Sequence, residues 1–139
     1  MDSLLLIFFG VILIIGIFVF VLISTRGRTT SVLDVDKYRT HWLSIEQKLV
    51  PDQVNSFTLA VLDADKLLDR ALKERGFKGQ TMGDRMKSAN NQWTNANNVW
   101  QAHKLRNRIA HEHGITITYA QARGALTYFR QALKDMGAI

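Results

Sequence analysis

The residues with the clearest capacity for chemistry lie in one stretch, 100–112, which reads Trp-Gln-Ala-His-Lys-Leu-Arg-Asn-Arg-Ile-Ala-His-Glu. Within it, Arg106 and Asn107 come shortly before His111. A free imidazole has a pKa of about 6.5, so a histidine can accept and release a proton near neutral pH. A guanidinium offers paired donors to phosphate oxygens. These residue types suit proton transfer at a phosphate ester.

A helix over this stretch would sort the side chains onto two sides. His103, Asn107 and His111 are spaced four apart, so they line one side together. The apolar residues gather on another side, which we expect to face a core: Val99, Ala102, Leu105 and Ile109. Arg106 lies on the flank between the two sides, where a charged group needs a partner because an unpaired buried cation is costly.

The string Leu-Arg-Asn-x-Ile-Ala-His-Glu resembles the signature of the HEPN superfamily, in which Arg, usually followed by Asn, precedes a His on the last turns of a helix. The resemblance covers about residues 33–137. It includes a long amphipathic helix upstream, a basic turn at Phe77-Lys78-Gly79, a short helix, and an amphipathic helix that closes the domain. It implies an HEPN-like helical fold.

The resemblance also implies a function. HEPN proteins that cut RNA do so without metal, and their sites are usually shared between two subunits. By this likeness, Arg106 contacts phosphate, His111 transfers protons and Asn107 supports the site. We expect RNA as the partner, a homodimer and no cofactor. Three neighbouring residues are predicted to bind the nucleic acid: His103, Lys104 and Arg108.

A structural interpretation of the same residues stays open. His111 is predicted near a helix C-terminus, where a cationic imidazole interacts well with the helix dipole. Arg106 has three carboxylates to pair with on the preceding long helix, namely Asp63, Asp65 and Asp69. Many HEPN-like domains are non-catalytic dimers that bind partners or nucleotides. The alternative function is therefore a membrane-tethered interaction or scaffold module with a protein partner, and whether the chain is an enzyme stays open.

No metal site is predicted. His103 and His111 are eight residues apart, while His111 and His113 diverge on a helix, and neither pair matches the His-Glu-x-x-His spacing. The sequence contains no cysteine, which excludes disulfides, thiol nucleophiles and thiolate metal sites. This composition fits a reducing compartment.

The elements that must position these residues are helices. Apolar periodicity predicts four main helices and a short one, over residues 35–49, 53–75, 82–88, 98–113 and from 118 onward. Pro51 ends the first, Gly76 follows the second, and Thr81 can cap the short one. Residues 89–97 are rich in Asn and are expected to form a loop. No strand of useful length is indicated, so the fold class is all-α, an antiparallel helical bundle.

An apolar segment precedes this domain. Residues 4–23 carry no charged or polar side chain, and 20 residues of helix span roughly 30 Å, the thickness of a bilayer's hydrocarbon core. A signal peptide would have a basic start, a shorter apolar core and a small-residue cleavage site, whereas this chain begins with Asp2. The sequence predicts a transmembrane anchor at 1–24, a juxtamembrane linker at 25–31 and the helical domain at 32–139.

Charge predicts the orientation and the class of partner. Arg26 and Arg28 directly follow the span, so the positive-inside rule places the C-terminal domain in the cytoplasm of a single-pass cell-membrane protein. The net charge of +6 suits an anionic partner, either nucleic acid or the anionic inner face of the membrane. Charge alone does not separate these two.

Overall fold

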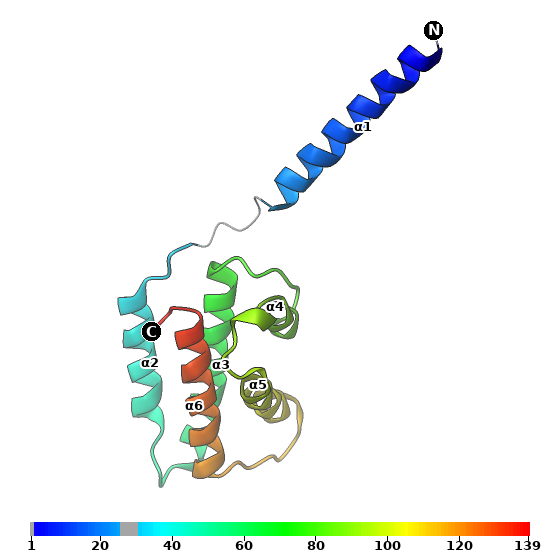
Figure 1. Ribbon diagram of the computed structural model, residues 1–139. Helices are drawn as coiled ribbons and strands as arrows, with labels where there is room; N and C mark the ends of the chain where they lie inside the picture. The colour runs from blue at the N-terminus through cyan, green and yellow to red at the C-terminus, as the bar shows by residue number, and fades with distance from the viewer. Residues whose placement is uncertain (1, 26–30) are drawn as a thin grey trace. The chain divides into compact units, whose positions relative to one another are not determined.

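Helices are the main secondary structure in the part of the protein that the structure describes. The computed structural model describes residues 2–25 and 31–139, which form six α-helices and one short 3-10 helix without any strand (Figure 1). The chain divides into two compact units, Met1–Thr30 and Ser31–Ile139. The all-α prediction is confirmed for these residues.

The first unit contains one helix, α1 (Asp2–Thr25). Its window Leu5–Leu22 has a mean hydropathy of 3.4 and buries none of its residues within the chain. A helix of 24 residues is roughly 36 Å long. This helix is therefore long and apolar enough to span a membrane. Of the predicted linker 25–31, residues 26–30, including Arg26 and Arg28, lie outside the described residues, and Thr25 is the last residue of α1.

The second unit is built around α3 (Val54–Glu74), which packs against all four other α-helices of that unit. Its apolar stripe is fully covered, and Gly76 takes the positive φ of 81° that lets the chain turn after the helix. The largest fully buried side chains come mainly from α2, α3 and α6: Tyr38, Leu68, Leu72, Phe129 and Leu133. The sequence places this helix correctly to within one residue at each end.

The helix α2 (Val35–Lys48) runs antiparallel to α3 (Figure 1). The side chain of Asp34 caps its first turn by accepting a hydrogen bond from the backbone N–H of Lys37. Tyr38, Trp42 and Ile45 form its buried face. This is the single helical face that the four- and three-residue spacing predicts.

The remaining helices are α4 (Met82–Ser88), α5 (Ala96–His111) and α6 (Tyr119–Asp135), with a 3-10 helix, η1, at Asn90–Gln92. Two predicted boundaries need correction. The expected loop 89–97 contains η1 and the first two residues of α5, because Asn95 rather than a later residue caps the helix by accepting from the backbone N–H of Asn98. The helix also ends at His111 rather than at 113, because the backbone at Glu112 is already extended.

The bundle is antiparallel only in part. Figure 1 shows α3 and α6 running in the same direction, and the rings of Phe57 and Tyr119, near the start of each helix, pack edge to face 5.8 Å apart. Figure 1 also shows α4 and α5 nearly end-on where α3 is seen lengthwise, so both cross it. This crossing carries the chain back to the N-terminal end of α3, from which α6 starts.

Candidate active site

Five of the six predicted site residues line a cleft between α3, α4 and α5, which we call the α3–α5 cleft. Its volume is about 930 Å³, and it is open to solvent. Arg106, Asn107 and His111 line it, together with His103 and Lys104. Arg108 does not line it and instead forms an exposed ion pair with Glu112, 3.4 Å away on the next turn. The cleft thus gathers the three predicted catalytic residues.

A buried carboxylate, Asp65, holds two of these residues. Its Oδ1 lies 2.8 Å from His103 Nδ1, and its Oδ2 lies 3.1 Å from Arg106 Nε. Asp65 is 2% exposed, so its carboxylate is buried. Val61 four residues before it and Leu68 three residues after it are both fully buried, so Asp65 lies on the inward face of α3. A carboxylate in that place requires cationic or hydrogen-bonding partners, which α5 supplies.

The guanidinium of Arg106 is held by protein groups along one edge and faces the cleft along the other. Its Nε makes an ion pair with Asp65 whose geometry is not that of a hydrogen bond, while its Nη1 donates to Asn107 Oδ1 at 3.1 Å. The side chain is 34% exposed and lines the cleft. A guanidinium fixed in this way presents its remaining N–H donors to an anion with little further loss of side-chain freedom.

His103 is buried and contacts other side chains of the protein, which its spacing along the helix does not predict. It is 8% exposed, its Nδ1 contacts Asp65, and its ring packs edge to face on Trp100 with 6.0 Å between the centroids. The Nδ1 atom of His103 therefore already has a polar partner within the protein, the carboxylate of Asp65. The predicted role of His103 in binding nucleic acid stays a prediction, and the geometry gives it in addition a role in positioning Asp65.

His111 is exposed at the end of α5 and lines the same cleft as Arg106. The helix ends with the backbone N–H of Glu112 donating to the Arg108 carbonyl at 2.8 Å, a bond in which the His111 ring takes no part. Among the residues that the structure describes, no hydrogen bond or ion pair engages the His111 side chain. The imidazole of His111 is therefore accessible from the cleft that Arg106 also lines.

Arg85 of α4 and Asp69 of α3 also line the cleft, and their side chains bond to each other rather than facing a ligand. Arg85 is 7% exposed, donates from Nε to Asp69 Oδ1 at 2.8 Å and from Nη1 to the Gly79 carbonyl at 2.7 Å. Burial alone would raise the pKa of Asp69, but hydrogen bonds from Lys73 and Arg85 outweigh burial and lower the pKa. Asp69 is therefore ionised at neutral pH, and Arg85 is neutralised and unavailable for a ligand.

Three lysines supply the positive charge that a ligand would meet. Lys66, Lys87 and Lys104 are exposed, line the cleft and form no ion pair with any described residue. Of these, only Lys104 belongs to the predicted set. Lys66 and Lys87 come from α3 and α4, and sequence reasoning did not single them out as ligand-binding residues because their place beside α5 depends on how α5 crosses the bundle.

A metal centre is not indicated. Within residues 2–25 and 31–139, no group of three or more His, Asp or Glu side chains is arranged to hold an ion.

Comparisons of the chain with family models, curated proteins and solved structures find no match. The function must therefore be argued from the site.

Proposed function

We propose that this chain is a membrane-anchored, HEPN-like endoribonuclease that cleaves RNA in the α3–α5 cleft without a metal ion. One observation carries the proposal: Arg106 and His111 line the same cleft. Asp65 anchors Arg106, and His111 is exposed and does not cap α5. In this proposal α1 spans the cell membrane and the domain lies in the cytoplasm.

The residues divide the chemistry between them. His111 accepts the proton of a ribose 2′-hydroxyl, whose oxygen then forms a bond to the adjacent phosphorus. The bond from phosphorus to the 5′-oxygen breaks, and that oxygen takes a proton from an imidazolium, supplied by a second copy of His111 in a two-fold dimer. Arg106 binds the non-bridging oxygens, and Asn107 and Asp65 keep the guanidinium in place. The products are a 2′,3′-cyclic phosphate and a free 5′-hydroxyl.

The rival proposal is a non-catalytic membrane-tethered module that recruits a protein partner. The observation that favours it is the ion pair of Arg106 with Asp65, because a pair of this kind can be purely structural. The two proposals differ in what they require of His111: a nuclease needs its imidazole, whereas a scaffold tolerates its loss.

The test is RNA cleavage by the chain in neutral detergent, with EDTA present throughout. We compare the parent chain with His111→Ala and Arg106→Ala, and with Lys134→Ala as the control, because Lys134 is an exposed cation of α6 that does not line the cleft. The nuclease proposal expects 2′,3′-cyclic phosphate ends, a rate loss of about 10²–10⁴-fold in His111→Ala, and a much smaller effect in the control.

Two results would reject the nuclease proposal. One is the absence of cleavage by a folded dimer across varied single-stranded and structured RNAs. The other is undiminished cleavage by a folded His111→Ala variant, which would trace the activity to a contaminant. Either result leaves the interaction module as the better account of the domain.

A further inference from the structure

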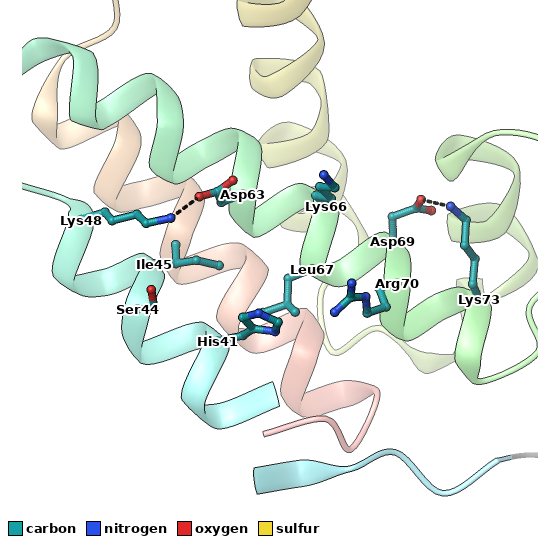
Figure 2. Close-up of a pocket in the computed structure, with 10 residues that line it drawn as sticks. All are labelled: His41, Ser44, Ile45, Lys48, Asp63, Lys66, Leu67, Asp69, Arg70 and Lys73. Atoms are coloured by element: carbon teal, nitrogen blue, oxygen red, sulfur yellow. Dashed lines mark hydrogen bonds and ion pairs between the residues drawn. The ribbon is translucent and has the colours of Figure 1, made fainter. Parts of the chain in front are cut away.

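A second groove lies on another face of α3, between α2 and α3. We call it the α2–α3 groove; its volume is about 480 Å³, within the range of small-ligand sites. Figure 2 shows its residues. The buried side chains of Ile45 and Leu67 form an apolar floor, and polar side chains from both helices surround that floor. The groove adjoins the α3–α5 cleft, because Lys66 and Asp69 line both cavities, while its other lining residues do not line the cleft.

Positive charge collects in this groove. Lys66, Arg70 and Lys73 follow one another on α3 at spacings of four and three residues, so they share one face of the helix. The facing helix α2 adds Lys48 and His41. The only carboxylates in the lining are Asp63 and Asp69, so four cations face two anions and the groove carries a formal charge of +2 with His41 neutral.

The two carboxylates neutralise only the ends of the groove. Lys48 Nζ lies 2.9 Å from Asp63 Oδ2, and Lys73 Nζ lies 2.7 Å from Asp69 Oδ2 (Figure 2). Between these pairs, Arg70, Lys66 and His41 form no ion pair or hydrogen bond with the residues that the structure describes. The centre of the groove therefore has positive charge that no ion pair or hydrogen bond with the described residues neutralises.

Arg70 and His41 come from different helices and extend over the same hollow, with Leu67 between them (Figure 2). The hydroxyl of Ser44 lines the groove one turn further along α2. Like charges four residues apart, as in Lys66 and Arg70, disfavour the helix on which they lie. A fork-shaped guanidinium, an ammonium group, an imidazole and a hydroxyl around one hollow are the donors that phosphate oxygens accept from.

We propose that the α2–α3 groove binds a phosphate-bearing ligand with at least two negative charges, through Arg70, Lys66 and His41. The charge matches the net +2 of the lining, and the volume suits a group the size of a diphosphate with its attached moiety. Two sources share this chemistry: a soluble diphosphate such as a nucleotide, and the phosphorylated headgroup of a lipid.

The primary test is calorimetry of the full chain in neutral detergent micelles, with inorganic pyrophosphate and ADP as probes. Arg70→Gln and His41→Ala remove groups that line this groove and not the α3–α5 cleft. We expect each to raise Kd, Arg70→Gln by about tenfold or more, as the loss of a charge-assisted hydrogen bond implies. Lys134→Gln is the control, because this exposed lysine of α6 loses the same charge and lines neither cavity.

A second arm separates the two sources. The full chain is placed in nanodiscs of phosphatidylcholine alone, or with phosphatidic acid added, and the amide NMR signals of α2 and α3 are compared. A shift that phosphatidic acid causes and Arg70→Gln abolishes, without pyrophosphate binding in micelles, assigns the groove to a lipid headgroup. Binding of pyrophosphate or ADP that depends on Arg70 supports the proposal with a soluble ligand.

The proposal is overturned if Arg70→Gln and His41→Ala bind the probes as the parent chain does, or if neither probes nor phosphatidic acid produce a response. Its failure is distinguishable from that of the nuclease proposal. His111→Ala should retain pyrophosphate binding, and Arg70→Gln should retain RNA cleavage, because each residue lines only one of the two cavities.

Discussion

Two aspartates of α3, separated by a single residue, have opposite environments. The side chain of Asp63 is 40% exposed and pairs with Lys48, whereas that of Asp65 is 4% exposed and pairs with His103 and Arg106. An exposed ion pair contributes little to stability because water screens it. A buried one that loses a partner leaves a charge without compensation. The same residue type on the same helix therefore offers a matched comparison.

Asp65→Asn should lower the free energy of unfolding by about 3 kcal/mol, the lower end of the cost for a broken buried pair, because Arg106 is 34% exposed. Asp63→Asn should change it by no more than about 1 kcal/mol. Urea denaturation followed by circular dichroism measures both. Equal effects of the two substitutions would contradict the assignment of Asp65 as the anchor of the site.

Asp69 predicts how stability depends on pH. Its folded-state pKa lies below the unfolded value of 3.8, so the folded state binds its proton less readily than the unfolded chain does. The stabilisation is complete above about pH 4 and disappears as the pH falls through the lowered folded-state pKa. Asp69→Asn should therefore reduce the loss of stability in acid, as thermal unfolding between pH 2 and pH 6 would show. If the stability of this variant falls between pH 6 and pH 2 as much as that of the parent chain, the prediction is contradicted.

At the scale of the elements, the sequence predicts helix ends better than helix directions. Capping residues are local signals, and Thr118 with Gln121 marks the start of α6 correctly. The direction of α6 relative to α3 depends on how α5 crosses the core, which no local pattern encodes. The same limit applies to the site: three aspartates could have paired with Arg106, and only the rotation of α3 about its axis selects Asp65.

The turn before α4 has a close approach that only glycine permits. A Cβ on Gly79 would lie 2.6 Å from Asp84 Cβ and 2.7 Å from the backbone nitrogen of Arg85. Gly79→Ala should therefore displace α4 and the Arg85–Asp69 pair and destabilise the domain by about 1–3 kcal/mol. In α6, a Cβ on Gly124 would meet nothing within 4 Å. Gly124→Ala should stabilise the domain by about 0.5–1 kcal/mol. Thermal denaturation measures both variants, and the prediction is confirmed if the melting temperature falls for Gly79→Ala and rises for Gly124→Ala.

At the scale of the whole molecule, α1 and the domain Ser31–Ile139 are separate compact units with opposite surfaces. The described large apolar side chains of α1 are exposed, as in Leu6 at 73% and Phe20 at 71%, whereas the second unit buries its own core. Exposed apolar area of this extent fits the proposal that α1 spans a bilayer, whose lipid tails would cover it. Removal of residues 1–30 should therefore release the domain from the membrane fraction without unfolding it.

The absence of cysteine from the sequence makes the orientation directly measurable. Single cysteines at Ser3 and at Lys134, both exposed, mark the two sides of α1. If the domain is cytoplasmic, as the charges of Arg26 and Arg28 predict, a membrane-impermeant maleimide added to intact cells labels Ser3→Cys alone, and both positions react after lysis. Labelling of Lys134→Cys in intact cells would place the domain outside. That result would remove cytoplasmic RNA as the substrate of the α3–α5 cleft, whatever the chemistry of His111.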